Sequence, residues 1–495
     1  MRLSRRPRTV SGPTDHVVVV GAGLAGLSTA MRLAAAGRRV TVLEREQVPG
    51  GRAGLLVRTT PEGTYRFDTG PTVLTMPDLI EDCFAALGER MEDWLTLRRV
   101  EPLYRAQFAD GTALDVRSDT EAMAAEVDAL AGGDAAGGYL RFVEFVTRLY
   151  RYEMADFIDR NIDSPFDLLT PNLARLAAAG GFRRLAPLVA RYLPDERLQR
   201  VFSFQALYAG VSPHEALALY AVITYMDAVA GVYFPAGGMH ALPAAMAAAA
   251  EKHGVELRYG CTVTAVEHSG GRATAVLTAD GDRVGCDAVV LNPDLPVARR
   301  DLLGAPLRRR LRYSPSCFLL LAGSSTSYPG LAHHTISFGQ SWRSVFEDLG
   351  KGRLMHDPSV LVSCPTVTEP ALAPAGRQSY YVLLPTPNTT ADLDWESLLP
   401  RYREHALTTL EQRGFDGFSA GIEVEDITTP ADWEALGMQA GTPFAASHTF
   451  AQTGPFRPGN LWGENVVFTG SGTIPGVGVP MVLVSGRLAA ERITG

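Results

Sequence analysis

The chain has 495 residues, a formal net charge of −8, 46% hydrophobic residues and 20% charged residues. These values predict a globular protein of two domains and argue against a disordered chain or a general nucleic-acid binder, for which a basic surface is expected. Five cysteines, an odd number with no C-x-x-C pair, suit reduced thiols and offer no metal site.

The first predicted elements form a dinucleotide-binding βαβ unit. The β-branched run 17–20 predicts a parallel strand buried on both faces. Residues 24–36 predict a helix, and 40–43 a second strand.

The arginine-rich start (Arg2, Arg5, Arg6 and Arg8) followed by an apolar stretch could resemble a secretion signal. Glycines and Arg32 interrupt that stretch, so we expect a protein that is not exported.

Glycines lie between this strand and helix at the spacing that phosphate binding needs. Gly21 permits a tight turn, Gly23 lets the backbone approach a pyrophosphate, and Gly26 lets the helix pack close to the strand. The N-terminal N–H groups of the helix would hold the phosphates. Glu44 ends the second strand, where an acid accepts hydrogen bonds from ribose hydroxyls and repels the extra phosphate of NADP.

The middle of the chain is a long excursion from this unit. Residues 75–230 have a mostly helical pattern, and 216–234 is the most apolar stretch within them. It contains Asp227 and lies between prolines, so a buried helix leading into a strand is favoured over a membrane span. Residues 273–294 predict strands with a hairpin turn at 281–282, and 310–450 mix strands with helices.

The chain then returns to a buried-strand pattern at 465–472, which opens on the glycine-rich stretch TGSGTIPGVGVP (469–480) and the last helix. This order predicts that the closing strand joins the first sheet and directs bare backbone toward the far part of the cofactor. Backbone N–H groups at a helix start can meet the pyrimidine edge of a flavin and stabilise its negative charge when reduced. A nicotinamide enzyme would not need this second cluster, so FAD is favoured over NAD.

The whole chain resembles the bacterial-type phytoene desaturase (carotenoid desaturase) family within the amine-oxidase-like FAD superfamily. GAGLAGL, VLERE, PGGRAG and GVYFPAGGMHAL are shared across that superfamily. FDTGPTVLT (67–75), LAHHTISFG (331–339), SYYVLLPTP (379–387), FAQTGPFRPGN (450–460) and TGSGTIPGVGVP are more specific to the desaturases, and they follow in the family's order. Two positions depart from the family pattern: Ile474 stands where many members have histidine, and Pro293 where alanine is common.

The resemblance implies an α/β, two-domain FAD-dependent oxidoreductase fold. The Rossmann-type FAD-binding domain would comprise 1–74, 232–305 and 455–495, and the substrate and membrane-associated domain, a mixed sheet with helices, 75–231 and 306–454. It also implies the cofactor-binding residues. The ADP half would be bound by Gly21, Ala22, Gly23, Gly26 and Glu44, the pyrophosphate by Arg52, the adenine by the Val263 backbone, and the isoalloxazine by Gly470, Pro475, Gly476, Val477 and Gly478.

The implied reaction is desaturation of phytoene, a long hydrocarbon without a polar group. Such a substrate needs an apolar channel, for which the helical region 75–230 is the natural source. The oxidised flavin accepts a hydride, and the protein supplies alignment, water exclusion and an acid or base. Asp227 and the helical pair Glu144 and Arg148 are candidates, although an i, i+4 pair is also typical of an ordinary surface ion pair.

Two adjacent histidines are expected to be structural. His333 and His334 fall on a predicted strand, so their side chains point to opposite faces and do not share a metal.

An apolar substrate also implies contact with lipid. We expect peripheral association with the inner face of the cell membrane, in the cytoplasm, and an electron acceptor such as oxygen or a quinone. The expected docking patch is 172–192, where Arg175, Arg183, Arg184 and Arg191 alternate with apolar residues. A core-facing helix pair with a solvated arginine face fits the same pattern.

Other functions remain open on the same fold. A flavin-dependent carotenoid isomerase, or a desaturase of another carotenoid, would use the same flavin and channel. An amine oxidase usually keeps a buried lysine near the flavin, whereas Lys252 and Lys351 lie in polar segments here. A prenyl-lipid-binding escort protein would have no need of the intact glycine motifs.

Overall fold

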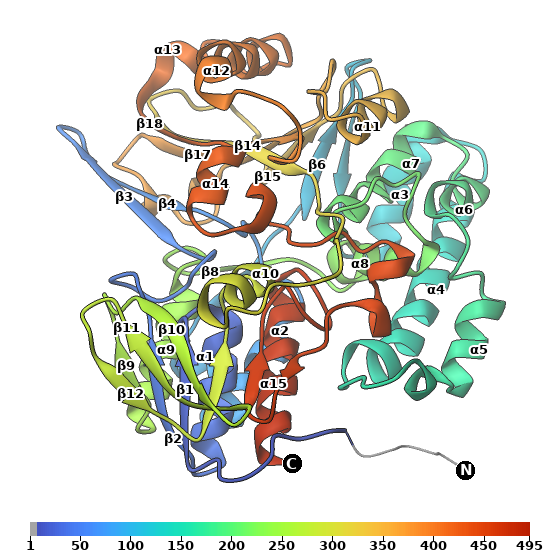
Figure 1. Cartoon of the computed structure of the whole chain (residues 1–495). Coiled ribbons are helices and arrows are strands. Elements are labelled where there is room, and N and C mark those ends of the chain that lie inside the picture. The colour runs from blue at the N-terminus through green and yellow to red at the C-terminus, as the bar shows by residue number, and fades with distance from the viewer. Residues whose placement is uncertain (1–6) are drawn as a thin grey trace.

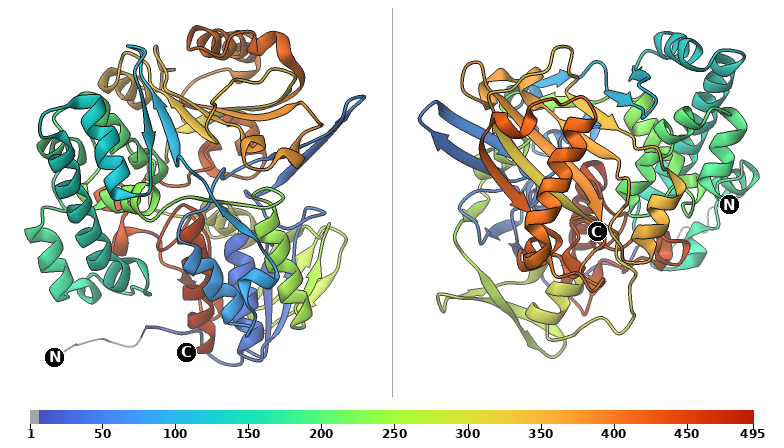
Figure 2. Two further views of the ribbon diagram at one scale, coloured as in Figure 1. Left: turned by 180° about the vertical axis from the view of Figure 1, so that it is seen from behind. Right: turned by 90° about the horizontal axis from the view of Figure 1, so that it is seen from above.

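The computed structural model describes residues 7–495; Arg2, Arg5 and Arg6 at the start of the chain lie outside them. Figure 1 shows two units, one around a six-stranded sheet with the carboxyl terminus beside it, and one around a seven-stranded sheet with a helical lobe. The rear and top views in Figure 2 show the helical lobe projecting to one side of the larger sheet. Within residues 7–495, no helix combines the length and the apolar character that crossing a bilayer requires.

The six-stranded sheet brings together segments from both ends of the chain. Its order is β19-β20-β13-β1-β2-β9, and every neighbouring pair except β19–β20 is parallel. Val17 pairs with Val40 of β2 on one side and with Ala288 of β13 on the other. The strands are β1 (His16–Val20), β2 (Arg39–Leu43), β9 (Glu256–Arg258), β13 (Ala288–Leu291), β19 (Leu461–Trp462) and β20 (Val466–Phe468).

The two faces of this sheet are covered differently, and strand β1 shows why. Val17 and Val19 belong to the core beneath the helices, whereas Val18 and Val20 belong to the core beneath a small antiparallel sheet, because side chains alternate along a strand. The helices are α1 (Leu24–Ala35), α2 (Pro77–Ala85), α9 (Ala241–Lys252) and α15 (Val479–Thr494). The small sheet comprises β10 (Val263–Ser269), β11 (Arg272–Thr278) and β12 (Arg283–Gly285), and β11 and β12 form the hairpin predicted at 281–282.

Close packing of the first and last helices fixes the carboxyl end of the chain against the amino-terminal motif. A Cβ on Gly486 of α15 would stand 2.6 Å from the Ala25 carbonyl of α1. Ser28 donates a hydrogen bond to the Leu483 carbonyl, and Thr29 donates one to the Gly486 carbonyl. The predicted return of the last strand and helix to the first sheet is therefore what the structure shows.

The larger sheet has the order β18-β14-β17-β16-β15-β6-β7. Helix α12 (Trp395–Gln412) covers one of its faces, and the other carries apolar side chains toward the inside of the molecule. The strands are β6 (Tyr104–Gln107), β7 (Ala113–Val116), β14 (Ser316–Ser324), β15 (His334–Ser337), β16 (Val360–Ser363), β17 (Gln378–Thr386) and β18 (Ile422–Thr428). The ribbon of β3 (Leu55–Thr60) and β4 (Gly63–Asp68) packs on the inner face through Tyr65 and Phe67.

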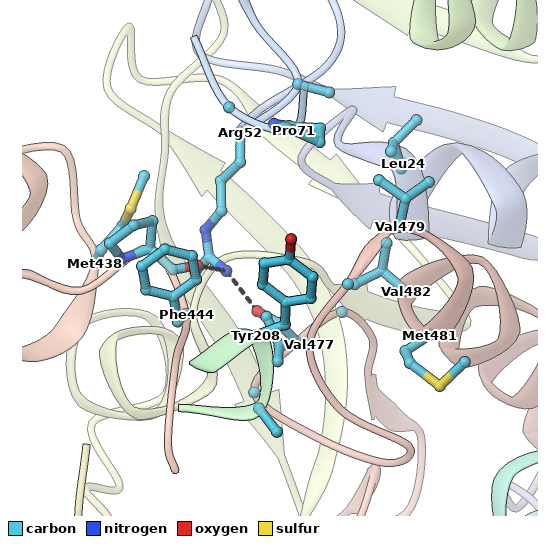
Figure 3. A pocket seen from close by; sticks show the side chains of 18 of the residues that line it. Leu24, Arg52, Pro71, Tyr208, Met438, Phe444, Val477, Val479, Met481 and Val482 are labelled. Carbon is cyan, nitrogen blue, oxygen red and sulfur yellow. Dashed lines mark hydrogen bonds between the residues drawn. The ribbon is translucent and has the colours of Figure 1, made fainter. Parts of the chain in front are cut away.

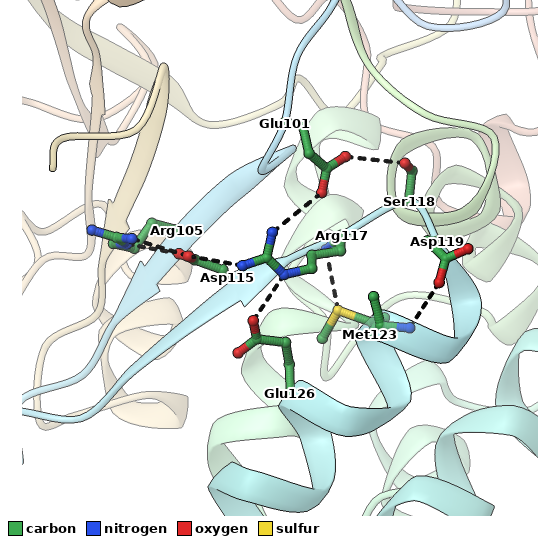
Figure 4. A network of polar contacts seen from close by, with 9 residues as sticks. Glu101, Arg105, Asp115, Arg117, Ser118, Asp119, Met123 and Glu126 are labelled. Carbon is green, nitrogen blue, oxygen red and sulfur yellow. Dashed lines mark hydrogen bonds and ion pairs between the residues drawn. The ribbon is translucent and has the colours of Figure 1, made fainter.

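The helical lobe is built by the excursion after the first unit. It comprises α3 (Thr120–Ala131), α4 (Ala135–Glu153), α5 (Pro171–Ala178), α6 (Leu185–Tyr192), α7 (Glu196–Val201) and α8 (Ala221–Thr224). A polar network joins it to the larger sheet, because Arg117 after β7 contacts Asp115, Glu101 and Glu126 of α3 (Figure 4). The remaining elements are β5 (Leu97–Arg99), which pairs with β8 (Tyr233–Pro235), and α10 (Leu295–Val297), α11 (Arg343–Gly350), α13 (Phe418–Gly421) and α14 (Pro430–Ala435).

Two expectations about the region 75–230 need correction. The strands β5 to β7 interrupt the predicted helices, because β6 and β7, around Tyr104 and Leu114, form an edge of the larger sheet and β5 pairs with β8. The stretch 216–234 is not one helix. It forms a 3-10 turn, the four-residue α8, a π-helical turn at Tyr225–Val229 and then β8, all within the interior.

Candidate functional site

One large cavity of about 1880 Å³ joins the two units. One end is lined by the glycine motif after β1, by the end of β2 and by the closing segment, which is defined here as residues 470–482. The rest is lined mainly by apolar side chains of the helical lobe and of the inner face of the larger sheet. Pockets for one small ligand usually measure about 300–1,000 Å³, so this cavity has room for a cofactor and a second molecule.

The two glycine clusters predicted from the sequence meet around one side chain, Asn292, just after β13. Its amide nitrogen would stand 2.6 Å from a Cβ on Gly23 and 3.1 Å from one on Gly26, and its amide oxygen 3.0 Å from one on Gly470. A Cβ on Gly26 would also stand 2.1 Å from the Gly21 carbonyl oxygen. Backbone packing excludes a side chain at Gly26, and side chains at Gly23 and Gly470 would displace the Asn292 amide, so the bare backbone there keeps Asn292 between the two clusters.

Glu44 is positioned by backbone donors at the end of β2. Its carboxylate accepts hydrogen bonds from the N–H groups of Ala22, at 2.6 Å, and Glu46, at 3.0 Å. The side chain is buried and lines the cavity beside Val263 of β10. The acid is thus held beside the glycine turn, in the place where a ribose hydroxyl of a dinucleotide is expected.

Arg52 extends across the cavity from the glycine-rich loop after β2. Its Nη1 donates hydrogen bonds to the Pro443 carbonyl, at 3.0 Å, and to Ser471 Oγ, at 2.6 Å. Burial lowers the pKa of Arg52, and nearby Asp294 opposes that shift. Figure 3 shows this side chain passing Phe444, with Val477 and Val479 of the closing segment in the same view. The guanidinium therefore joins the first loop to the closing segment, and its contact with a pyrophosphate stays a prediction.

Gly478 lies at the start of α15 and lines the cavity. Its φ of +110° favours glycine, and no protein atom lies within 4 Å of the position that a Cβ would take. Pro475, Val477 and Gly470 line the same wall. The backbone at the start of the last helix therefore faces open volume, as expected for a ligand that contacts it directly.

For Gly476 the structure shows a reason for glycine that the sequence did not indicate, and contact of its backbone with the isoalloxazine stays a prediction. Gly476 does not line the cavity, and a Cβ there would stand 2.1 Å from Cε1 of His448. The missing side chain makes room for that imidazole, which itself lines the cavity. Gly26 and Ala22 also do not line the cavity. Gly26 lets the start of α1 pack closely on the Gly21 carbonyl, and the Ala22 N–H donates a hydrogen bond to the Glu44 carboxylate.

Arg457 holds the closing segment in place from behind. Its guanidinium is buried and donates hydrogen bonds to the carbonyls of Thr473, Ser471 and Ala446. Burial lowers the pKa of Arg457 to about 10. A buried cation that satisfies three carbonyls fixes the path of this irregular backbone.

Asp227, a predicted acid or base, does line the cavity. It lies on the π-helical turn at Tyr225–Val229, is 7% exposed, and accepts a hydrogen bond from Gln205 Nε2 at 3.4 Å. Burial raises the pKa of Asp227 to about 6, and the bond from Gln205 opposes the rise. The position allows a catalytic role, which stays a prediction.

The raised pKa of Asp227 leads to a stability prediction. Between 3.8, the usual value, and about 6, the folded protein holds a proton on this group that the unfolded chain releases, so stability falls as pH rises through this window. We expect Asp227→Asn to raise the free energy of unfolding by up to about 3 kcal/mol at pH 8 and by less at pH 5. Urea unfolding at the two pH values measures this, and an equal change at both would contradict it.

Glu144 and Arg148 were wrongly predicted as catalytic candidates. They form an ion pair of 3.3 Å on the outer face of α4, with side chains 69% and 49% exposed. Neither residue lines the cavity. A solvated pair outside the cavity wall cannot exchange a proton with a buried substrate, and the surface ion pair is the interpretation that the structure supports.

The two histidines differ in their surroundings. His333 Nδ1 lies 2.7 Å from Thr368 Oγ1 and its ring lies 4.6 Å from that of Phe234, which is a structural role. His334 lines the cavity, and burial holds its pKa well below the usual value, with His333 adding to the shift. Within residues 7–495 there is no cluster of side chains suited to a metal ion.

The two lysines of the chain lie away from the cavity. Lys252 pairs with Glu89 at 2.6 Å, and Lys351 is exposed just after α11. In the part of the chain that the structure describes, no lysine therefore lines the cavity wall. This argues against an amine oxidase of the kind that keeps a buried lysine near the flavin.

Sequence reasoning missed two polar residues in the cavity. Glu153, the last residue of α4, is 4% exposed, and burial raises its pKa well above the usual value. His448, against Gly476, is buried, and burial together with Arg457 holds its pKa well below the usual value. Both side chains line the cavity near the closing segment.

The residues at the glycine-lined end fit a flavin dinucleotide. The turn at Gly21 and Gly23 faces the cavity at the start of α1, Glu44 is fixed beside it, and the start of α15 at Gly478 faces the same volume. Two helix N-termini on one elongated site suit a ligand with phosphates at one part and a reducible, electron-rich ring at another.

Comparisons with known proteins place this geometry in a family. The family model described as "Flavin containing amine oxidoreductase" matches residues 24–494. The chain is 59% identical to a protein of Streptomyces griseus named "Phytoene dehydrogenase", over 98% of this chain and 96% of the relative. It is 38% identical to a "zeta-carotene-forming phytoene desaturase" of Myxococcus xanthus, over 97% of this chain and 93% of the relative.

A solved structure shows the same fold at low identity. The cyclohexylamine oxidase of Brevibacterium oxydans IH-35A has a TM-score of 0.60 to this chain and 16% sequence identity, over 97% of this chain and 99% of that one. At this identity the likeness concerns the arrangement of the two units alone, since one fold hosts many activities.

Proposed function

The chain belongs to the flavin-containing amine oxidoreductases, as an FAD-dependent oxidoreductase of the phytoene desaturase type, and from this premise we propose that it dehydrogenates phytoene in successive steps toward lycopene or a related polyene. The observation that carries the proposal is the cavity itself. It joins a dinucleotide cradle to a chamber whose wall is mostly apolar and contains no lysine in the described part of the chain. Such a chamber suits a long hydrocarbon with no polar group.

FAD supplies the oxidant that accepts a hydride from the substrate. The chain's own residues have three tasks in this reaction, which are to align the substrate, to exclude water and to receive the proton. The apolar wall, including Met226, Phe204 and Leu219, holds the hydrocarbon in line with the closing segment and excludes water. Asp227 is a candidate for the group that receives the proton.

Expression in a phytoene-accumulating host tests the proposed function. We expect coloured carotenoids with longer conjugation, identified by their absorption spectra after extraction. Unchanged phytoene, with the protein present and carrying flavin, would contradict the proposal. A change of double-bond geometry without added double bonds would favour the carotenoid isomerase instead.

We further propose that the cavity opens toward lipid at an apolar rim. The rim is defined here as the exposed large apolar side chains near its lobe end: Phe166, Leu169, Phe182, Phe450 and Phe456. Phe166 is 78% exposed, and the ring of Phe450 lies 6.4 Å from that of Phe182 and 5.9 Å from that of Phe456. Phe182, Phe450 and Phe456 also line the cavity, so an apolar molecule could pass from a bilayer to the interior without crossing water.

The rim refines the docking patch expected at 172–192. Within that stretch Phe182 is the exposed large apolar residue, whereas Leu176, Leu185, Leu188 and Val189 are buried in the core. The arginines are exposed. The stretch therefore agrees in part with the alternative of a core-facing helix pair with a solvated arginine face. The apolar contact with lipid would be made by Phe182 together with Phe450 and Phe456, which are distant in sequence.

Basic side chains flank the rim. Arg183 is exposed next to Phe182, and Arg309 is exposed while donating hydrogen bonds to the carbonyls of Phe456 and Ala451. A basic residue near an anionic membrane surface contributes about 1 kcal/mol, so these charges and the rim would act together. This supports peripheral association with the inner face of the cell membrane, where anionic headgroups are exposed.

Flotation with liposomes tests the rim. We expect the wild type to float with anionic vesicles, less so in high salt, and the double variant Phe182→Glu/Phe450→Glu to lose most of this binding while keeping its flavin. Arg183→Glu/Arg184→Glu should weaken binding to a smaller extent. Val57→Glu, at an exposed apolar residue on the β3–β4 ribbon, is the matched control and should float like the wild type. Undiminished flotation of the phenylalanine double variant would place the docking surface elsewhere.

The reduced cofactor must return its electrons to an acceptor. We propose that oxygen or a membrane quinone takes them, since a protein docked at a bilayer meets both. Anaerobic addition of a soluble quinone analogue to the reduced holoenzyme should restore the visible absorbance of oxidised flavin. If neither this quinone nor oxygen restores it, another acceptor is required.

A further inference from the structure

This inference rests on the proposed function and concerns which residue receives the proton. Glu153 lies at the end of α4, where that helix packs against α8 and the π-helical turn. Its side chain lines the cavity, and its carboxyl has no hydrogen-bond partner within residues 7–495, with Oε1 fully buried. An unpartnered buried carboxyl costs free energy, so such groups are rare unless they serve a function.

Comparison with the other buried acids that line the cavity sets Glu153 apart. Glu44 accepts two backbone hydrogen bonds, Asp227 accepts one from Gln205, and Asp294 accepts one from the Gln439 N–H. Each of these three is held in one orientation by the protein. In the described part of the chain, Glu153 alone among these four has a carboxyl free to meet another molecule in the cavity.

Glu153 also lies at the end of the cavity where the closing segment stands. Burial raises the pKa of the Tyr220 hydroxyl, and nearby Glu153 adds to the rise, while Thr453 and Arg457 oppose it. The Tyr220 ring lies 5.7 Å from that of His448, which in turn packs on Gly476. A row of neighbouring residues therefore connects the carboxyl to the backbone on which the flavin ring is expected.

We propose that Glu153 is the catalytic base that removes the proton in each desaturation step. One C–H bond of the substrate breaks with its electron pair leaving as a hydride to FAD. The neighbouring C–H bond breaks, its electron pair becomes the second bond of the new C=C, and its proton forms an O–H bond with the Glu153 carboxylate. The substrate thus loses two electrons, which FAD gains, and the proton later passes to solvent.

The surroundings suit this task in two ways. Burial makes the ionised carboxyl a stronger base than one in water, which a proton on an aliphatic chain requires. Its negative charge also stabilises the positive charge that develops on the hydrocarbon when the hydride leaves, and it does so in a low-dielectric cavity where the interaction is strong.

Anaerobic single-turnover kinetics test the proposal. The holoenzyme is mixed with phytoene in liposomes, and the loss of the visible absorbance of oxidised flavin is followed. We expect Glu153→Gln to slow this reduction about 10²–10⁴-fold, the range that one general base contributes, and Glu153→Asp to restore part of the rate. Flavin content and flotation should match the wild type, because the amide keeps the shape of the side chain, and the melting temperature should not fall, because the amide removes a buried ionisable group.

Two variants serve as comparisons. Glu144→Gln removes a carboxylate from the outer face of the same helix and should leave the rate unchanged. If Glu153→Gln reduces flavin within about threefold of the wild-type rate while Asp227→Asn is slowed more than 100-fold, the proton goes to Asp227 and this proposal is overturned. If the wild type itself does not reduce its flavin with phytoene, the proposed function fails instead. Should Glu153→Gln not fold, a normal rate in a folded Glu153→Asp or Glu153→Ala would overturn the proposal equally.

Discussion

Replacing Gly26 by valine is expected to leave a protein without bound flavin. Even a Cβ at this position would stand 2.1 Å from the Gly21 carbonyl oxygen and 3.1 Å from the Asn292 amide nitrogen. The two branches of valine would push the start of α1 away from the turn that holds the phosphates, and overpacking of this kind costs about 1–3 kcal/mol or more. Flavin absorbance after purification in FAD-supplemented buffer measures the loss.

Two further variants separate this effect from a general loss of stability. Glu44→Leu removes the acid that the Ala22 and Glu46 N–H groups hold beside the turn, and it should also lose flavin. Gly350→Val, at an exposed glycine with ordinary φ and no atom within 4 Å of its Cβ position, is the matched control and should retain it. Full flavin occupancy in both Gly26→Val and Glu44→Leu would mean that the amino-terminal motif is structural only.

Replacing Gly478 by leucine is expected to abolish phytoene conversion while part of the flavin affinity remains. The leucine side chain would enter the open volume in front of α15, where the isoalloxazine is expected, whereas the site around Gly21 and Glu44 for the other half of FAD is unchanged. We expect a weaker affinity for FAD, a shifted flavin spectrum and conversion below a few per cent of wild type.

The control for Gly478→Leu should also place a leucine at a positive φ. Gly37, after α1, has a φ of +75° and open space around its Cβ position, but it is exposed and does not line the cavity. A non-glycine residue at a positive φ costs about 1–3 kcal/mol, and the cost is greater at Gly478, whose φ of +110° and ψ of 150° lie in a region that glycine alone populates readily. Gly37→Leu should therefore lose some stability and keep its activity. Normal turnover by Gly478→Leu would remove the start of α15 from the site.

The cofactor end of the site could be predicted from the sequence because local rules determine it. The buried run at Val17 to Val20, the glycine spacing and the acid at Glu44 specify a turn and a strand end within 30 residues. The closing glycines were predicted to meet this turn, and they do so around Asn292. The role of Gly476 could not be predicted, because it depends on His448, which lies 28 residues earlier on an irregular loop.

The substrate end was less predictable because its residues come together only through tertiary packing. Glu144 and Arg148 have the helical spacing of an ion pair, and spacing alone does not tell which face of α4 is buried. A signal for Glu153 was present in the same helix. Phe142, Phe145, Val146 and Leu149 follow the core-facing period, and Glu153 occupies the next position of that period, four residues after Leu149. An acid at a core position indicates a functional carboxyl.

The rim shows the same limit of local reasoning. Amphipathic spacing in 172–192 indicated a surface with arginines, but most of its leucines face the core of the lobe. Phe450 and Phe456 reach the rim from a loop more than 250 residues away in sequence, where the ring of Phe450 packs near that of Phe182 and the ring of Phe456 near that of Phe450.

Anaerobic mixing of the purified holoenzyme with phytoene in liposomes tests most directly that this cavity carries out a flavin-dependent dehydrogenation. A desaturase must reduce its flavin as it adds each double bond, whereas an isomerase returns its flavin to the starting state and an escort protein leaves it unused. The account predicts that the oxidised-flavin absorbance disappears in step with the appearance of a more conjugated product, one double bond per flavin. Flavin that stays oxidised, with phytoene bound or isomerised and no double bond added, would contradict it.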